Sequence, residues 1–350
     1  MNDVRFDSKH QLGIITLTRP QALNAINLPM IKAMQQQLLL WEKNDSIKAI
    51  VIQSELEKAF CAGGDVRWLY ETGLKNKTEQ MQFFWHEYRL NHYIHHLKKP
   101  YIALLNGITM GGGVGISLHG SYAVANEKFI FAMPETGIGL FPDIGASYLL
   151  ARCPGEIGLY LALTGNRLNA EEAYAAGLVN YLISNNDLTT VIPRLCELDL
   201  SQNSHEQIKN FFQTLAKNSD LTFPNSEKIN YYFAKSSVLD IISSLKESDD
   251  PWALATLKTL EQKSPLSLAV TFEQINRAKS LSMAECVKMD YRLVGHFMQD
   301  HDFYEGIRAL LIDKDKNPRW SPDNLKAITP ALVANYFEHD GEELTLLLEH

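Results

Sequence analysis

Two acidic residues near the end of a glycine-rich stretch are the first candidates for chemistry in this chain. Glu135 and Asp143 stand among apolar and glycine residues at the far end of residues 107–145. Carboxylates are rarely placed there for stability alone. An extended chain would separate the two by roughly 26 Å, so they meet only if the chain reverses, which the glycines and proline between them permit. In a shared pocket, one carboxylate could act as base or nucleophile while the other holds a hydroxyl or a water.

Asp143 also has a purely structural interpretation. The segment that follows it, IGASYLLAR (144–152), has helical character. An aspartate just before a helix commonly accepts hydrogen bonds from the amides of its first turn. The local sequence therefore leaves two roles open for Asp143, a helix cap and a ligand-binding carboxylate.

Two further glycine-rich loops follow strand-like segments and run into helical ones. They are AFCAGGDVRWL (59–69), in which Asp65 is a suitable helix cap, and NGITMGGGVGISLHG (106–120). Helix N-termini expose unpaired N–H groups and a partial positive charge. Two such loops can each direct one N–H group at a single oxygen, which is the geometry of an oxyanion hole. For each loop alone, a tight turn with close helix packing is the alternative.

Several other chemistries lack their sequence signatures. The glycine loops contain no GK[ST] ending, and the dinucleotide pattern G-x-G-x-x-G fails at Ile116 and at Leu118. No G-x-S-x-G motif occurs, which disfavours a serine hydrolase. His92, His95 and His96 cluster on a predicted helix without HExxH or a carboxylate at ligand spacing, so no metal site is predicted.

The elements that must position these loops alternate between strand and helix in the first part of the chain. The predicted strands are 13–18, 47–53 and 101–105, followed by the short segments SYAVA and FIFA, and the predicted helices are 28–44 and 77–98. This alternation indicates an α/β fold with crossover connections. Residues 203–312 carry long amphipathic patterns typical of helices. We expect residues 1–200 to form the core with the active site and 201–350 a mainly helical extension.

Composition narrows the class of protein. The chain has 350 residues, 45% of them hydrophobic, and a net charge of −8, which argues against non-specific binding to nucleic acid or anionic membranes. Its four cysteines are scattered without metal-binding spacing, as in a reducing compartment. The first ten residues carry no apolar signal segment, and no run suits a membrane span. These features predict a soluble cytoplasmic protein.

Taken together, the motifs resemble the crotonase (enoyl-CoA hydratase/isomerase) superfamily. The matching segments cover most of residues 10–185 in order and at the family's spacing: TLTRPQALNAI (16–26), AFCAGGDV (59–66), NGITMGGGVGISLHG (106–120), MPETGIGLFPDIGASYLL (133–150) and LTGNRLNAEEAYAAGLVN (163–180). The resemblance implies a spiral of ββα units that binds acyl-CoA thioesters. It implies no metal and no redox cofactor, because coenzyme A is part of the substrate. It also maps the two oxyanion N–H groups to Gly64 and Gly112.

Departures from the family pattern point to one branch of it. Hydratases carry a glutamate three residues after the second oxyanion glycine, where this chain has Gly115. Asp143 stands where hydratases usually have glycine. The string PETGIGLFPDIG and the tail FYEGIRALLIDKDKNPRW (303–320) resemble the branch that hydrolyses short 3-hydroxyacyl-CoA thioesters, in valine breakdown. The runner-up is an enoyl-CoA hydratase or isomerase that works with one acid.

The resemblance also implies roles for the acids. Glu135 would attack the thioester carbonyl to form a mixed anhydride, or would activate water as a general base. Asp143 would hydrogen-bond the 3-hydroxyl group of the substrate. Glu87 matches an acidic position of the hydrolase pattern and would border the same pocket; a solvated or paired residue is its alternative. Arg67 is a candidate for contact with a CoA phosphate, or a solvated helix residue. Formation of a homo-oligomer is left open.

Overall fold

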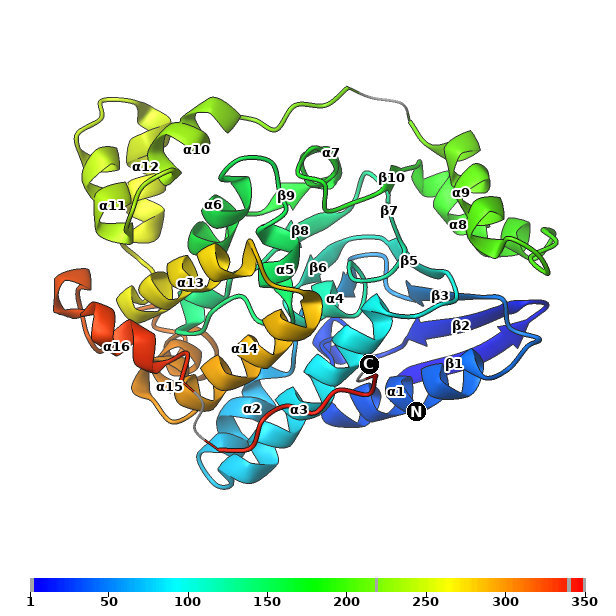
Figure 1. Cartoon of the computed structure of the whole chain (residues 1–350), viewed down its shortest axis with the longest axis horizontal. Coiled ribbons are helices and arrows are strands. Elements are labelled where there is room, and N and C mark those ends of the chain that lie inside the picture. The colour runs from blue at the N-terminus through cyan, green and yellow to red at the C-terminus, as the bar shows by residue number, and fades with distance from the viewer. Residues whose placement is uncertain (1–2, 218–219, 339–340, 349–350) are drawn as a thin grey trace.

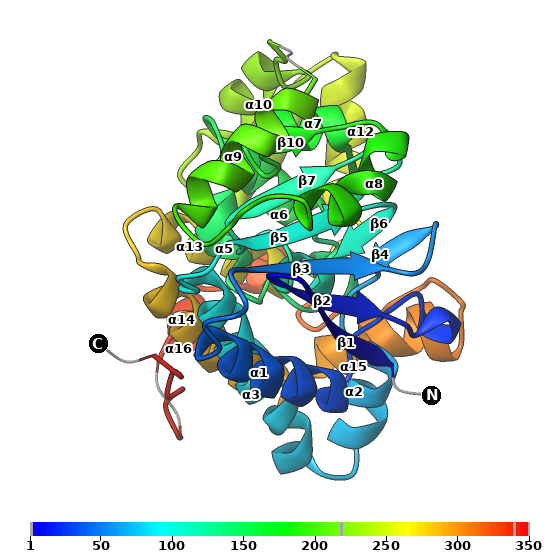
Figure 2. The same cartoon turned by 90° about the vertical axis from the view of Figure 1, so that its right-hand side faces the viewer.

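Two β-sheets form the centre of the molecule, with helices packed around them (Figure 1). The computed structural model describes residues 3–217, 220–338 and 341–348. The larger sheet has six strands in the order β1-β2-β3-β5-β7-β10, and Figure 2 shows them following one another through the molecule. The smaller sheet has four strands in the order β4-β6-β8-β9. Apart from the antiparallel pairs β1–β2 and β8–β9, neighbouring strands run parallel.

The elements have the following bounds. The strands are β1 (Val4–Lys9), β2 (Leu12–Leu17), β3 (Ala49–Ser54), β4 (Ala59–Cys61), β5 (Tyr101–Leu105), β6 (Ile108–Met110), β7 (Tyr122–Ala125), β8 (Ile130–Ala132), β9 (Leu168–Asn169) and β10 (Tyr181–Leu182). The helices up to residue 215 are α1 (Leu28–Glu42), α2 (Val66–Gly73), α3 (Lys77–His95), α4 (Gly112–Gly115), α5 (Ala146–Leu150), α6 (Ile157–Thr164), α7 (Ala170–Ala175), α8 (Asn185–Leu195) and α9 (Ser204–Leu215), with short 3₁₀ turns η1 (Pro20–Ala22) and η2 (Glu135–Ile138). The remaining helices are α10 (Ser226–Phe233), α11 (Val238–Lys246), α12 (Pro251–Leu260), α13 (Pro265–Ala278), α14 (Met283–Phe297), α15 (His301–Ile307), the π-helical turn η3 (Arg308–Ile312), η4 (Leu325–Ala327) and α16 (Pro330–Asn335).

Three consecutive strand pairs build the spiral that the family resemblance implies. In β3–β4, β5–β6 and β7–β8, the first strand joins the larger sheet and the second joins the smaller one. A helical segment follows each pair, namely α2, α4 and η2. The predicted α/β fold with ββα units is therefore confirmed. The predicted strand 101–105 matches β5, and the predicted helices 28–44 and 77–98 correspond to α1 and α3.

The inner strands β2, β3, β5 and β7 of the larger sheet are largely buried on both faces, and they are mostly apolar for that reason. Alternate residues of β3 belong to different clusters, because successive side chains point to opposite faces. Ile50 and Ile52 belong to the main core, whereas Ala49 and Val51 pack with residues of α8 and α9 in a second cluster. Helices thus cover both faces of this sheet.

The later helices pack closely on the spiral. Helix α13 contacts α5 and α6, α14 contacts α3 and α5, and α15 contacts α2 and η2. Figure 1 shows α13 and α14 beside α5. The main hydrophobic core contains residues from both parts of the chain. The expected division at residue 200 lies between α8 and α9, which cover the same sheet face, and stays a prediction.

Candidate active site

Three parallel strands of the smaller sheet end at one edge and carry the candidate groups there. Cys61 of β4 is in register with Thr109 of β6, which is in register with Phe131 of β8. Gly64 follows β4, Gly112 follows β6, and Glu135 follows β8. Ligands of parallel sheets commonly bind beyond the carboxyl ends of the strands. The spiral thus brings one candidate from each turn to the same place.

The two glycine loops meet at this edge. A Cβ atom on Gly111 would lie 3.6 Å from the Gly63 Cα and 2.9 Å from Glu135 Oε1. Gly63 and Gly111 have φ of +118° and +45°, so glycine is needed in both backbones. Within the described residues, neither the Gly64 amide nor the Gly112 amide donates a hydrogen bond. Two unused donors on adjoining loops are what an oxyanion hole requires.

Three carboxylates line one cavity beside these loops. Glu87, Glu135 and Asp143 are only 2%, 6% and 6% exposed, and they border a cavity of about 680 Å³. The cavity walls are largely apolar and include Leu69, Phe83, Phe84, Ile138, Leu140, Ile144 and Leu311. Gly64 and Gly112 line the same cavity. The expected convergence of Glu135 and Asp143 on one pocket is therefore present, and Glu87 joins them.

Burial raises the pKa of all three acids, and the charges of neighbouring carboxylates add to the rise for Glu87 and Glu135. Burial, followed by the charges of Asp143 and Glu135, raises the pKa of Glu87 well above its ordinary value. Burial and the charge of Asp143 do the same to the pKa of Glu135. Burial raises the pKa of Asp143 to about 6, although a hydrogen bond from Tyr88 opposes the rise. Perturbed carboxyl groups gathered in a cleft are typical of catalytic sites.

The carboxylate of Asp143 does not cap a helix. Helix α5 begins at Ala146, its N-cap is Gly145, and no side chain caps it. The Asp143 Oδ2 atom instead accepts a 2.7 Å hydrogen bond from the Tyr88 hydroxyl. The cap interpretation is wrong because two left-handed residues, Ile144 and Gly145, turn the chain between Asp143 and the helix. Tyr88 was not among the predicted site residues, although it lies next to Glu87 in an aromatic-rich segment of α3.

Glu87 and Arg67 occupy different parts of the cavity. The Glu87 carboxylate is buried, so the solvated alternative is wrong, and its Oε1 atom has no hydrogen-bond partner among the described residues. Arg67 lies at the cavity rim and donates a 2.9 Å hydrogen bond to the Leu311 carbonyl. Arg19, which sequence reasoning missed, also borders the cavity and donates to Asp65 at 2.7 Å. Asp65 caps α2 through the Trp68 amide, as predicted.

Gly115 lies outside the cavity that the three acids border. A Cβ atom there would lie 2.6 Å from Asn91 Nδ2 and 3.1 Å from Ile144 Cβ. Gly115 is buried within α4, and it does not line the acid-bearing cavity. A side chain at this position would therefore require Asn91 to move.

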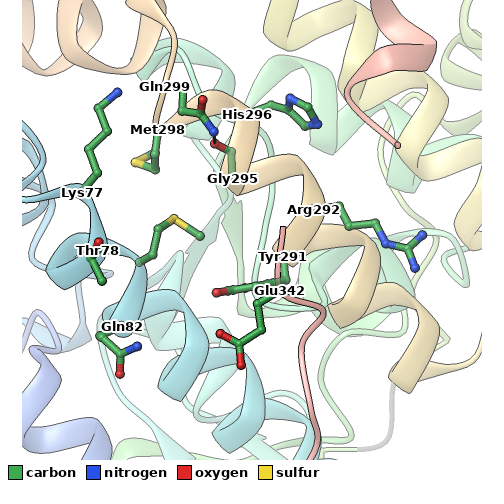
Figure 3. Close-up of a pocket in the computed structure, with 11 residues that line it drawn as sticks. Lys77, Thr78, Gln82, Tyr291, Arg292, Gly295, His296, Met298, Gln299 and Glu342 are labelled. Carbon is green, nitrogen blue, oxygen red and sulfur yellow. Dashed lines mark hydrogen bonds between the residues drawn. The ribbon is translucent and has the colours of Figure 1, made fainter. Parts of the chain in front are cut away.

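A second cavity, of about 400 Å³, lies between α3 and α14. Figure 3 shows Lys77, Thr78 and Gln82 of α3 on one side and Arg292 and His296 of α14 on the other. It contains none of the three buried acids.

Within the ranges described by the structure, no group of three His, Cys, Asp or Glu side chains could hold a metal ion. In the same ranges, no helix is long and apolar enough to cross a membrane.

Comparisons with known proteins place this geometry in context. The family model described as enoyl-CoA hydratase/isomerase matches residues 12–337. The relative from Danio rerio named "3-hydroxyisobutyryl-CoA hydrolase, mitochondrial" is 41% identical over 99% of this chain and 92% of its own length. The relative of the same name from Homo sapiens is 40% identical over 97% of this chain and 89% of its own length.

Two solved structures resemble the whole chain. A carnitinyl-CoA dehydratase from Mycobacterium thermoresistibile is 33% identical with a TM-score of 0.92, and each chain covers 100% of the other. An enoyl-CoA hydratase from Rhodobacter sphaeroides is 34% identical with a TM-score of 0.90, covering 99% of this chain and 100% of its own. The similarity therefore extends through the later helices as well as the spiral.

Proposed function

The chain belongs to the enoyl-CoA hydratase/isomerase family, and we propose that it hydrolyses the thioester bond of 3-hydroxyisobutyryl-CoA. The name of relatives 40–43% identical to it supports this substrate. The observation that carries the proposal is the cavity itself. It holds Glu135 beside the two free amides and also contains a buried aspartate, Asp143. The position at which a hydratase would carry its other glutamate is Gly115. Such a site suits cleavage of a thioester that bears a hydroxyl group.

The Gly64 and Gly112 amides bind the thioester oxygen in this proposal. As a nucleophile adds to the carbonyl carbon, negative charge develops on that oxygen and the two N–H groups stabilise it. Removing one oxyanion donor typically lowers turnover by about 10²–10³-fold. Both donors come from the backbone of loops fixed by the parallel register, so they require no rearrangement during the reaction.

Glu135 supplies the nucleophile by one of two routes. In the first, its carboxylate attacks the carbonyl carbon, the C–S bond breaks, the electron pair leaves on sulfur, and water then cleaves the resulting anhydride. In the second, Glu135 takes a proton from water while the water oxygen attacks, and the CoA sulfur leaves with the C–S electron pair and receives a proton. Borohydride added during turnover separates them, because it would reduce a Glu135 anhydride to an alcohol detectable in the peptide mass.

In this proposal, Asp143 recognises the 3-hydroxyl group of the substrate by accepting a hydrogen bond from it. As the acid with the least strongly raised pKa of the three, at about 6, it is ionised at neutral pH and can accept a hydrogen bond from the substrate. A site built around a hydroxyl rejects the analogue lacking it by about 10⁴–10⁵-fold, because the buried polar group is otherwise left unpaired. Glu87 adds a third acid to the cavity, whose apolar lining residues suit the methyl group.

Hydration of an enoyl-CoA is the competing function, since the two similar solved structures are named for hydratase and dehydratase activity. Gly115 argues against it, because it supplies no second acid at a position where a Cβ atom would lie 2.6 Å from Asn91 Nδ2.

One assay distinguishes the two functions. Purified protein is mixed with 3-hydroxyisobutyryl-CoA, and free thiol and enoyl absorbance are followed together. We expect thiol release, and we expect Glu135→Gln to lower it by at least about 10²-fold with an unchanged circular dichroism spectrum. Enoyl absorbance without thiol release would exclude the hydrolase. Normal thiol release by Glu135→Gln would exclude the assigned role of Glu135.

Finer aspects of the proposal need separate measurements. A role in valine breakdown requires growth of a deletion strain on valine. Activity that persists after dialysis against a chelator would support the expectation of a reaction without metal. The proposed cytoplasmic location differs from the word "mitochondrial" in the relatives' names, and cell fractionation tests it. Light scattering decides whether the protein forms a homo-oligomer, which the sequence leaves open.

A further inference from the structure

The loop that carries Asp143 is held in an unfavourable backbone conformation. Ile144 has φ of +60° and Gly145 has φ of +71°, so two consecutive residues are left-handed. A β-branched residue such as isoleucine rarely adopts this region. Strained residues of this kind persist only where the surrounding structure fixes them, and they cluster at functional sites.

Three buried side chains bind the backbone on both sides of Asp143. Gln274 Nε2 of α13 donates to the Pro142 carbonyl at 3.0 Å. The Gly145 amide donates to Asp290 Oδ2 of α14 at 2.7 Å. His119 Nε2, from the segment after α4, lies 2.8 Å from the Ile144 carbonyl and donates to it. Every backbone group bound in this way belongs to residue 142, 144 or 145.

The three residues form a preorganised set. Gln274 and Asp290 are fully buried and His119 is 4% exposed. Gln274 Nε2 also donates to Asp290 Oδ1 at 2.7 Å, so one amide group links the loop to the second helix. Burial lowers the pKa of His119 to about 3, which keeps its ring neutral with the proton on Nε2 at physiological pH. None of the three borders the cavity, so they act on substrate only through the loop.

We propose that His119, Gln274 and Asp290 are positioning residues that hold Asp143 against the substrate hydroxyl, so that discrimination for hydroxylated thioesters depends on helices α13 and α14. The inference rests on the proposed function of Asp143. It assigns the later helices a part in substrate choice, beyond covering the spiral. Displacing a reacting or binding group by about 1 Å can cost about 10²-fold in rate, so a loosened loop has a measurable effect.

The test compares two thioesters that differ only by the hydroxyl group, 3-hydroxyisobutyryl-CoA and isobutyryl-CoA. Two variants are compared. Asp290→Asn replaces one carboxylate oxygen, which accepts from the Gly145 amide or from Gln274, with an NH₂ group that donates. Gln274→Met has a similar volume but loses the amide that donates to Pro142 and Asp290. We expect kcat/KM for the hydroxylated substrate to fall by about 10–10²-fold, while the value for isobutyryl-CoA, measured at high enzyme concentration, changes by less than about threefold. The ratio of the two values should therefore fall.

Asp302→Asn is the matched control. Asp302 is an equally buried aspartate that accepts hydrogen bonds from Ser264 and from the Ser321 amide, away from residues 142–145. We expect this control to lower the melting temperature without changing the substrate ratio. If Asp290→Asn does not fold, Gln274→Met carries the test, because it keeps the bond between Asp290 and Gly145.

The possible results distinguish a failure of the positioning role from a failure of the proposed role of Asp143. Equal losses on both substrates would overturn the positioning role and leave Gln274 and Asp290 as purely structural residues. The unmodified protein and both variants could all favour the hydroxylated substrate by the same large ratio of kcat/KM values. That result would also overturn the positioning role, but it would leave the proposed function intact. A ratio near one in the unmodified protein would overturn the hydroxyl-reading role of Asp143 and the positioning role together.

Discussion

Replacing Tyr88 with phenylalanine removes one oxygen atom from beside Asp143. The Tyr88 ring is fully buried on α3, and its hydroxyl donates to Asp143 Oδ2 at 2.7 Å. Phenylalanine keeps the ring contacts with Phe84 and Tyr291, so the change is confined to the hydrogen bond. Burial raises the pKa of Tyr88 well above its ordinary value, so the hydroxyl is a proton donor at every working pH.

The size of the effect follows from the charge on Asp143. A hydrogen bond to a charged group contributes about 1.5–3 kcal/mol, equal to a change of roughly 10- to 150-fold in kcat/KM. The bond also lowers the pKa of Asp143, which burial raises to about 6. Its loss raises that pKa further. Activity requires both Glu135 and Asp143 to be ionised. Loss of the hydrogen bond from Tyr88 disfavours that doubly ionised state, so the acid limb of the profile should move to higher pH.

The measurement is kcat/KM for thiol release from about pH 5 to about pH 9, a range that brackets the pKa of Asp143. Tyr93→Phe is the control, because Tyr93 is a buried tyrosine of the same helix whose hydroxyl binds Glu42 and which does not line the cavity. We expect the control to keep the acid limb of the unmodified protein. A Tyr88→Phe variant with unchanged rate and unchanged acid limb would refute the view that an ionised Asp143 reads the hydroxyl.

Three further predictions concern glycines and the third acid. Gly115→Glu should lower the melting temperature without producing hydratase activity, because its Cβ would lie 2.6 Å from Asn91 Nδ2; measurable hydration would contradict this. Gly112→Ala should lower kcat by about 10²–10³-fold in the thiol assay by displacing an oxyanion amide, since its Cβ would lie 2.6 Å from Glu87 Oε1. Glu87→Gln should melt at a higher temperature near pH 8, because the folded-state pKa of Glu87 is raised and its ionisation opposes folding. The difference in melting temperature should disappear as pH falls below the ordinary glutamate pKa, where Glu87 is protonated in both the folded and the unfolded state. A difference that stays constant with pH would contradict this reasoning.

The sequence allowed much of the spiral to be predicted because its signals are local. Continuous apolar runs mark strands that are buried on both faces, such as β3 and β5. Glycines after those strands mark the two loops, and the lone acids mark Glu135 and Asp143. These features need only the chain immediately around them.

The partners of Asp143 were missed because they lie far away in sequence. Tyr88, Gln274 and Asp290 are 55, 131 and 147 positions from it, and no local pattern links them to the loop. One signal was available. Asp290 lies on the apolar face of α14, among buried residues such as Val287 and Leu293, where an acid needs a partner. An acid on the buried face of an amphipathic helix is a reason to look for a distant amide.

The long sequence separation of these contacts has a consequence for folding. The bond from Arg67 to Leu311 joins positions 244 apart, and the bond from Gly145 to Asp290 joins positions 145 apart. Such a topology folds slowly, because distant segments must find each other before their contacts stabilise the fold. At about 5–20 residues per second of synthesis, Asp143 is made roughly seven to thirty seconds before Asp290 of α14, which helps to complete the pocket. The nascent chain should therefore gain the ability to recognise its substrate only near the end of translation.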